Sequence, residues 1–274
     1  MSSRKIGGMV IVALAVLALG LVVTRQLMTR PENEVLVLCG GSMRDALETL
    51  KERYAQVSSD TILTTYGGSG ELCAQIQNTG KGDIYVCHDP FMPWADKKGL
   101  IGEWCTLGAL EVVIIVPKGN AKGIKTLEDL ARPNLRVGIG NQIYSSSGQI
   151  TKYMLKKLDV GPDIIENVRV ETKGHQQRCN DVVMGTLDTA IVWNAVAELY
   201  KDQVEIIPIP KTYVDAITSA TYGEVDLTYT KVTVGMISPS HEHPATQRFY
   251  KFLATEGEAI LADMGFSPVR EQTL

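Results

Sequence analysis

The chain has 274 residues, of which 45% are hydrophobic, 21% are charged and 6% are aromatic, and its formal net charge is −4. This composition excludes a disordered chain, a collagen-like repeat and a small disulfide-stapled domain. The length predicts one large α/β domain or two smaller lobes, with enough apolar residues to form a core. Nucleic acid is not an expected partner, because nucleic-acid binding requires a basic face.

The N-terminal region carries an uncharged apolar segment at residues 6–23, directly after Arg4 and Lys5. Its length is within the range of about 17–25 residues that a membrane-spanning helix needs, whereas a cleaved secretory signal has an apolar core of about 7–15 residues. We therefore predict an uncleaved signal anchor and linker over residues 1–30, with a cleaved signal as the alternative. Because positive charges precede the span, the rest of the chain is predicted to lie in the periplasm or on the outer face of the cytoplasmic membrane.

Beyond the linker, short apolar strands alternate with helical patterns, which is typical of βαβ units and parallel sheets. A first series predicts strands at 35–38, 61–66 and 83–87 and helices at 43–54, 71–77 and 93–98. A β-branched strand at 110–116 and a helix at 127–131 follow. The second series predicts strands at 136–139, 168–171, 189–192 and 204–209 and helices at 150–158, 177–184 and 195–200. The chain ends with a mixed region, a strand at 232–237 and helices at 245–253 and 256–264.

Two successive series of similar size predict two lobes. The first series lacks a final element, which the C-terminal strand and helices can supply, so we predict that the second lobe is inserted into the first. The predicted first lobe comprises residues 31–115 and 208–274, and the second comprises residues 116–207.

The five cysteines are widely spaced and form no C-x-x-C motif, so neither a zinc ribbon nor a thioredoxin motif is expected. Their disulfide pairing stays open. Cys87, His88 and Asp89 are consecutive on a predicted strand, where neighbouring side chains point to opposite faces and cannot easily share one metal ion. We therefore predict no metal site.

Three predicted strand-to-helix junctions combine glycine with serine. They span residues 39–42, 66–70 and 144–148. The unpaired N–H groups and partial positive charge of a helix N-terminus attract anions, and glycine allows the backbone to approach a ligand closely. Each serine is also a good helix cap, which is the purely structural alternative. The candidate anion-binding residues at these junctions are Gly41, Ser42, Gly68, Ser69 and Ser147.

Motifs of catalysis and cofactor binding are missing from the sequence. It has no P-loop, no dinucleotide-binding G-x-G-x-x-G, no G-x-S-x-G elbow and no H-E-x-x-H, so we predict no enzyme and no cofactor. An extracytoplasmic enzyme that assembles its residues from distant segments stays as an alternative.

Several segments, taken in order, resemble the periplasmic molybdate-binding proteins of ABC importers. Ser42-Met43-Arg44-Asp45-Ala46-Leu47 is similar to the S-x-x-D-A-L junction of that family, and Gly67-Gly68-Ser69-Gly70-Glu71-Leu72 to its G-G-S-x-x-L junction. Similar stretches follow at residues 82–89, 98–101, 115–120, 127–131, 256–260 and 265–266. The resemblance implies a two-lobed type II periplasmic binding protein that closes on a tetrahedral oxyanion and delivers it to an ABC permease without catalysis.

The resemblance also implies which residues hold the ligand. Ser42 and Ser69 match the two serines of the family, and Ser147 lies where a backbone N–H contacts the ligand, with its hydroxyl as an extra donor. His175 lies near the other backbone contact and could add a positive charge if protonated. Trp193 replaces the ligand-binding tyrosine of the family, and its indole can donate but not accept a hydrogen bond.

These departures leave the identity of the ligand open. Molybdate or tungstate is the first expectation, and phosphate, sulfate or a small organic acid is the alternative. A ligand-sensing module that reports to a membrane partner is a further alternative, which the predicted anchor would suit.

Overall fold

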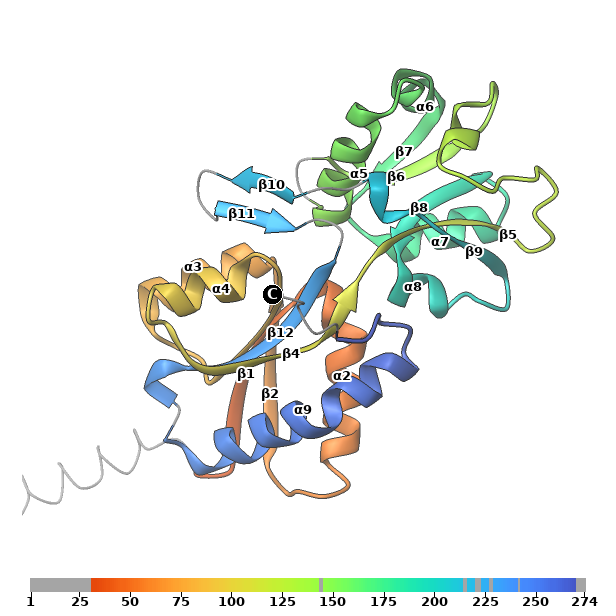
Figure 1. Cartoon of the computed structure of the whole chain (residues 1–274). Helices are drawn as coiled ribbons and strands as arrows, with labels where there is room; N and C mark the ends of the chain where they lie inside the picture. The colour runs from red at the N-terminus through yellow and green to blue at the C-terminus, as the bar shows by residue number, and fades with distance from the viewer. Residues whose placement is uncertain are drawn as a thin grey trace, which may run out of the picture.

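The structure is a computed structural model, which describes residues 31–142, 145–213, 216–219, 223–226, 229–240 and 242–269. Within these ranges the chain forms two five-stranded sheets, each flanked by helices, and a small two-stranded sheet (Figure 1). The predicted anchor at residues 1–30 lies outside the described residues. No helix in the part that is described is both long enough and apolar enough to span a membrane.

The first sheet combines the N-terminal strands with a strand from the far end of the chain. Its order is β2-β1-β3-β12-β4, where β1 pairs in parallel with β2 and β3 and β12 is antiparallel to β3 and β4. Its strands are β1 (Glu34–Gly40), β2 (Thr61–Gly67), β3 (Ile84–His88), β4 (Ile101–Leu110) and β12 (Thr230–Ile237). Its helices are the short η1 (Gly41–Met43), α2 (Arg44–Tyr54), α3 (Ser69–Thr79), α4 (Phe91–Lys97) and α9 (Pro244–Asp263), with the short η4 (Ser238–Ser240) before α9.

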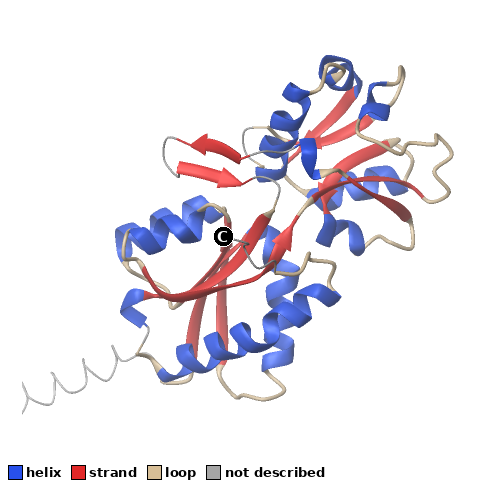
Figure 2. Ribbon diagram, in the orientation of Figure 1, coloured by secondary structure: helices blue, strands red, loops and turns tan. Residues whose placement is uncertain are grey.

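The central strands of the first sheet, β1, β3 and β12, are buried on both faces, because their apolar residues alternate between two cores. On one face, Val37 shares a core with Leu47 of α2 and Phe249 of α9. On the other face, Leu38 packs in the same core as Leu72 of α3. Figure 2 shows the helices on both sides of this sheet. These central strands are therefore continuously apolar, whereas the edge strand β2 alternates between exposed and half-buried residues.

The second sheet repeats this arrangement with the order β7-β6-β8-β5-β9. Ile114 of β5 lies in one core with Met154 of α5, and Ile115 lies in the opposite core with Val182 of α7. Its strands are β5 (Val112–Pro117), β6 (Val137–Gly140), β7 (Val168–Thr172), β8 (Thr189–Trp193) and β9 (Val204–Pro208). Its helices are η2 (Glu128–Ala131), α5 (Ser146–Lys157), α6 (Gly161–Asn167), α7 (His175–Val183) and α8 (Asn194–Glu198). After β9 come η3 (Lys211–Tyr213) and an antiparallel pair, β10 (Ala216–Ser219) and β11 (Gly223–Asp226).

Some elements differ from the sequence predictions. The sequence analysis did not predict β4, because polar residues and Gly108 interrupt its apolar pattern. It also treated α6 as a loop, because this helix begins with Gly161 and Pro162. The two predicted C-terminal helices form one helix, α9. Gly257 continues that helix because Leu107 of β4 packs against it, 3.1 Å from the position of an added Cβ. Residues 112–115, which were assigned to the first lobe, pair within the second sheet.

The chain passes from the first sheet to the second at Glu111, and Asn194 holds this crossing. The N–H of Glu111 donates to Asn194 Oδ1 at 3.0 Å, and the N–H of Asn194 donates to the Glu111 carbonyl at 2.9 Å. Asn194 Nδ2 also donates to the Gly265 carbonyl, just after α9. One side chain therefore connects the second sheet to both halves of the first lobe.

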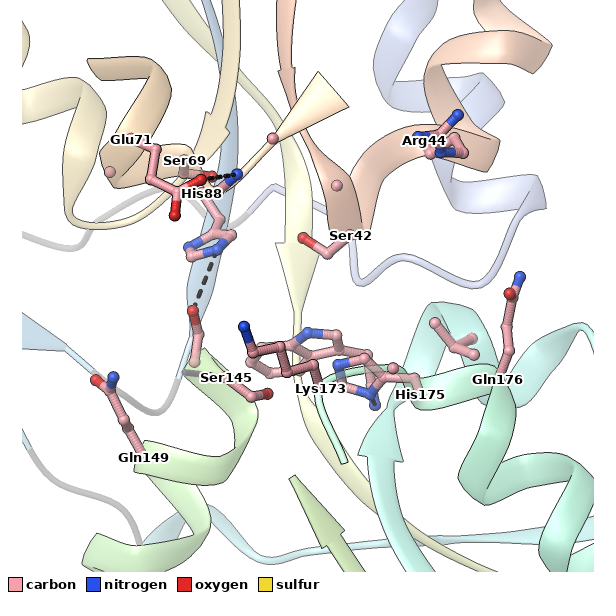
Figure 3. A pocket seen from close by; sticks show the side chains of 18 of the residues that line it. Ser42, Arg44, Ser69, Glu71, His88, Ser145, Gln149, Lys173, His175 and Gln176 are labelled. Carbon is pink, nitrogen blue, oxygen red and sulfur yellow. Dashed lines mark hydrogen bonds between the residues drawn. The ribbon is translucent and has the colours of Figure 1, made fainter. Parts of the chain in front are cut away.

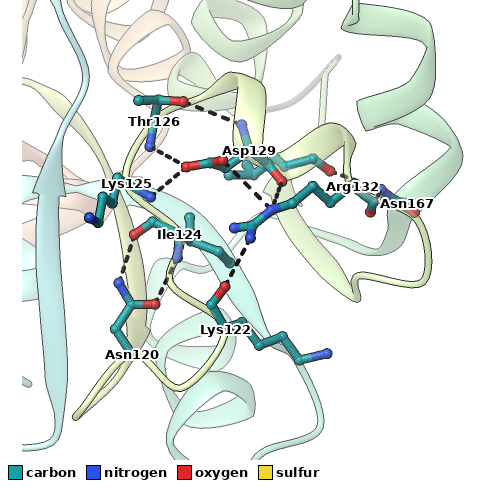
Figure 4. Close-up of polar contacts among 9 residues, drawn as sticks. Asn120, Lys122, Ile124, Lys125, Thr126, Asp129, Arg132 and Asn167 are labelled. Atoms are coloured by element: carbon teal, nitrogen blue, oxygen red, sulfur yellow. Dashed lines mark hydrogen bonds and ion pairs between the residues drawn. The ribbon is translucent and has the colours of Figure 1, made fainter.

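The long connection from β5 to β6 is held by side chains that imitate backbone pairing (Figure 4). Asn120 exchanges two hydrogen bonds with the backbone of Ile124. Asp129 Oδ2 accepts from the N–H groups of Lys125 and Thr126, and these bonds close the turn before η2. A segment with little regular structure is thereby fixed to the second lobe.

All five cysteines are unpaired thiols, and four of them are buried. Burial raises the pKa of the Cys87 thiol to about 12, so this thiol is protonated at neutral pH. Within the described ranges, no group of three or more His, Cys, Asp or Glu residues is placed to hold a metal ion.

Candidate functional site

A cleft of about 650 Å³ lies between the two lobes, where several helices begin. It is lined by residues from both sheets and from the first turns of α3, α5 and α7. In the first sheet, β1 lies between β2 and β3, and in the second, β6 lies between β7 and β8. These are the points where the chain changes direction across each sheet, and ligands of open α/β sheets bind at such points.

Ser69 is the residue of the first lobe whose environment most clearly indicates a missing partner. The side chain is 6% exposed, and its Oγ is buried without a hydrogen-bond partner among the described residues. Gly40 makes this position possible, because a Cβ there would lie 2.4 Å from Ser69 Oγ. A buried hydroxyl without a partner is unfavourable, so a ligand that accepts its hydrogen bond would be stabilised at this place.

The start of α3 is fixed from two sides. The Tyr85 hydroxyl donates to the carbonyl of Ser69 at 2.6 Å, and Glu71 Oε2 accepts from the N–H of Gly68 at 3.3 Å. The N–H of Gly68 is therefore engaged by the chain itself, although Gly68 lines the cleft.

Ser42 and Gly41 lie at the mouth of the other junction of the first lobe. Both are exposed in the cleft, and the Ser42 hydroxyl contacts Met43 Sδ at 3.0 Å. Sulfur is a weak acceptor, so this hydroxyl can turn to a better one. Figure 3 shows Ser42 and Ser69 on the first lobe, opposite Ser145 and His175 of the second lobe.

The serine-rich junction of the second lobe presents different serines from the one expected. Ser147 is completely buried and does not line the cleft, because it lies behind Ser145 and contacts its hydroxyl at 3.0 Å. Ser145 and Ser146 line the cleft instead. The helix α5 begins at Ser146, so Ser147 is its second residue, and the Ser147 side chain points into the protein.

His175, the first residue of α7, is held as a neutral ring by the hydrogen bonds to its Nδ1, which removes the condition under which it would add a positive charge. Its Nδ1 accepts the N–H of Trp193 at 3.2 Å and a hydrogen bond from Arg178 Nη2 at 3.0 Å. A nitrogen that accepts from two N–H donors cannot itself carry a proton. Burial, and then the charge of Arg178, hold the pKa of His175 well below its ordinary value. His175 therefore offers one donor, Nε2–H.

Trp193 lies at the cleft in the position that the resemblance assigned to a tyrosine. It is 2% exposed, and its ring stacks on His175 with centroids 5.7 Å apart. The indole therefore forms a wall of the cleft and holds the imidazole in place.

Two hydrogen bonds join the lobes across the cleft, and the sequence analysis did not predict them. His88 Nδ1–H donates to the Asp89 carbonyl at 2.7 Å, so its Nε2 accepts from the Ser146 hydroxyl at 3.3 Å. Gln176 Nε2 donates to Asp45 Oδ2 at 3.2 Å. Burial lowers the pKa of His88, which keeps it a neutral acceptor.

Charged side chains at the edge of the cleft were also missed. Arg44 lies over the ring of Tyr66, 3.9 Å from its centre, and both Arg44 and Lys173 line the cleft. Lys173 comes directly before Gly174 and His175, and this basic residue at a strand-to-helix junction could have been recognised in the sequence as a residue of the cleft.

A family model described as bacterial extracellular solute-binding protein matches residues 35–267. The chain therefore belongs to this family of bacterial extracellular solute-binding proteins, which implies a periplasmic or secreted protein. A putative binding protein of Haemophilus influenzae is 23% identical over 239 residues, which cover 86% of this chain and 92% of the relative. Molybdate-binding protein ModA of Mycobacterium tuberculosis is 24% identical over 186 residues, which cover 67% of this chain and 69% of the relative.

Solved structures share the two-lobed fold. The substrate-binding domain of a putative molybdenum ABC transporter from Clostridium difficile has a TM-score of 0.67 at 18% identity and covers 86% of this chain and 99% of its own. The periplasmic molybdate-binding protein of Azotobacter vinelandii has a TM-score of 0.66 at 17% identity, covering 86% and 100%. The sulfate-binding protein SubI of Mycobacterium tuberculosis has a TM-score of 0.61 at 18% identity, covering 86% and 87%.

Proposed function

We propose that the cleft captures a tetrahedral oxyanion, with molybdate or tungstate as the first candidates, for delivery to an ABC importer. The observation that carries this proposal is the Ser69 hydroxyl, which is buried at the cleft without a partner. The first-turn N–H groups of α3, α5 and α7 lack partners within their helices. Together with the hydroxyls of Ser42 and Ser145, they form a set of donors suited to an anion.

The chemistry of the set favours an anion that carries no proton at neutral pH. Serine hydroxyls and backbone N–H groups donate, whereas the one N–H of the neutral His175 ring, on Nε2, faces Ser147 behind the cleft. A protonated anion would bring an additional donor into a cleft rich in donors, which costs free energy when it stays unpaired. The molybdate-binding relatives support the same ligand class, and the sulfate-binding neighbour makes sulfate the main competitor.

Delivery to a transporter follows from the family and from the two lobes. Binding proteins of this kind close around a ligand and present it to a membrane permease, without catalysis. The contacts from His88 to Ser146 and from Gln176 to Asp45 bridge the lobes across the cleft. We expect the ligand to add to these contacts on closure.

We also propose that residues 1–30 hold the protein at the outer face of the cytoplasmic membrane. The charge-flanked apolar segment at residues 6–23 supports this anchor. N-terminal sequencing of the native protein tests it. A mature protein that begins after residue 20 would contradict it.

Thermal unfolding of the full chain in detergent, with each oxyanion in turn, tests the proposed ligand. Ligand at about 100 times its Kd adds about 2.7 kcal/mol of stability, which raises the Tm by about 5–10 °C for a protein of this size. We expect this shift with molybdate and tungstate, and no shift with sodium chloride of equal ionic strength. If the Tm rises only with sulfate or phosphate, the proposal of an anion site stands, but molybdate is not its ligand. No shift with any oxyanion would reject the proposed class.

A further inference from the structure

Arg178 is a buried cation directly behind the cleft. Its side chain is 0% exposed, and burial lowers its pKa to about 10, so it remains charged at neutral pH. No carboxylate pairs with it among the residues that the structure describes. Its acceptors are all neutral: the carbonyls of Ile191, Thr172 and Gly174, the Thr172 hydroxyl and His175 Nδ1.

A buried charge without a counterion is expensive in free energy. The neutral carbonyls around Arg178 reduce this cost, and an anion in the adjacent cleft would reduce it further. An anion in the cleft would lie near this charge, because only the His175 side chain separates the Arg178 guanidinium from the cleft.

The hydrogen bonds that begin at Arg178 have a fixed direction. Arginine only donates, so His175 Nδ1 accepts, and the N–H of Trp193 donates to the same nitrogen. The proton of the neutral ring is therefore on Nε2, which lies 3.4 Å from Ser147 Oγ and donates to it. The hydroxyls of Ser147 and Ser145 lie 3.0 Å apart, and in the proposed chain Ser147, which accepts from His175, donates to Ser145 Oγ.

The chain of donors ends at the cleft. Ser145 Oγ has no other partner among the described side chains, and Ser145 lines the cleft. With its oxygen occupied as an acceptor, its hydrogen is directed away from Ser147. Figure 3 shows Ser145 and His175 on the second lobe, below Ser42. A chain of hydrogen bonds in one direction polarises each member, so the last donor is strengthened.

We propose that Arg178 is the positioning and charge-supplying residue of the anion site, acting through His175 and Ser147 on Ser145. This proposal rests on the proposed anion-binding function. It explains why a histidine and an extra serine occupy this junction, and it identifies Ser145 as the residue that contacts the ligand in place of Ser147.

A double-mutant cycle on the full chain in detergent tests the proposal, with molybdate titrated calorimetrically. Ser145→Ala and Arg178→Gln are each expected to weaken binding about tenfold or more. In the Ser145→Ala background, Arg178→Gln is expected to cause less than about a threefold further loss, because the end of the chain is already removed. Arg169→Gln is the matched control, since Arg169 is exposed and contacts only backbone carbonyls.

Additive losses in the cycle would overturn the proposal, as would wild-type affinity in either single variant. A second measurement remains decisive if Arg178→Gln does not fold. Nitrogen NMR of the wild-type ring, assigned with His175→Gln, is expected to show a protonated Nε2 and an unprotonated Nδ1 between about pH 6 and pH 8. A protonated Nδ1 would overturn the proposal. Wild-type protein that binds no oxyanion, with the NMR result intact, would reject the proposed function instead.

Discussion

Two histidines line the cleft, and in each case the neighbouring hydrogen bonds determine what the ring can do. His175 receives two N–H donors on Nδ1 and is left with one donor. His88 donates from Nδ1 to a carbonyl and is left with one acceptor. Neither ring supplies a charge at neutral pH, so the positive groups at the cleft are Arg44, Lys173, the helix N-termini and Arg178 behind it, while Asp45 and Glu71 line the same cleft with negative charge.

Ser69→Ala tests the role of the buried hydroxyl at the residue scale. The substitution removes a buried polar atom to which the described part of the chain offers no partner, so we expect unchanged or higher stability of the ligand-free protein. Because a hydrogen bond to a charged group contributes about 1.5–3 kcal/mol, we also expect oxyanion binding to weaken by tenfold or more. Chemical denaturation without ligand and calorimetric titration measure the two effects.

Ser240→Ala is the matched control for this prediction. The Ser240 hydroxyl donates to the Gly82 carbonyl at 3.0 Å, outside the cleft. Its removal is expected to lower stability by about 1 kcal/mol and leave affinity unchanged. A Ser69→Ala protein that is less stable without ligand and binds normally would show that the hydroxyl has a structural role only.

At the scale of elements, the junction of β6 and α5 depends on close backbone packing. A Cβ on Gly148 would lie 2.3 Å from the Asn141 carbonyl oxygen and 2.4 Å from that of Gly140. Glycine at position 148 therefore lets α5 begin directly on the end of β6. This close approach brings Ser145 to the cleft and turns Ser147 inward.

The attachment of α6 to η2 provides a prediction at the same scale (Figure 4). Asn167, 5% exposed, ends α6 and donates through Nδ2 to the carbonyls of Leu130 and Arg132, both at 2.8 Å. Asn167→Ala leaves both carbonyls without this donor, so we expect a loss of about 2–3 kcal/mol in the free energy of unfolding. Urea denaturation measures it. Asn180→Ala, on the exposed side of α7, is the control, and equal losses in the two variants would contradict this explanation.

At the scale of the whole molecule, an ion pair joins the two separate parts of the first lobe. Asp60, just before β2, accepts from Arg248 of α9 at 2.6 Å and 2.9 Å. The hydrogen bond from Arg248 is the main reason that the pKa of Asp60 falls from 3.8 to about 2. The pair joins the two parts of the lobe through residues that are 188 positions apart in the sequence.

Acid should remove the contribution of this pair. The folded state lowers the pKa of Asp60, so its stabilisation is complete above the unfolded pKa of 3.8 and disappears as the pH falls through about 2. Arg248 is half exposed, so we expect a contribution of only about 1–2 kcal/mol. Asp60→Asn should lose this amount at pH 7 and match wild type near pH 2. Urea denaturation across this range tests it, with Asp96→Asn as control, and a constant difference at all pH values would contradict it.

The sequence determined the parts of the protein that depend on local pattern. Apolar runs and helical periodicity predicted most strands and helices, because the central strands of both sheets are buried on two faces and leave a strong signal. The serine and glycine junctions predicted where Ser42 and Ser69 lie, since a strand followed by a helix places its junction at the end of the sheet. The concealed β4 and α6 were missed, because Gly108 in one and Gly161-Pro162 in the other resemble turns.

Only the tertiary structure decided which side chains meet. His88 and Ser146 are 58 residues apart, and no local pattern predicts their contact or the acceptor role that the carbonyl of Asp89 gives His88. The choice between Ser145 and Ser147 depends on a rotation of one residue at the start of α5, within the uncertainty of any helix boundary taken from sequence. The charge of His175 depends on Arg178 and the N–H of Trp193. Each of these properties arises from hydrogen bonds that form only when separate elements pack together.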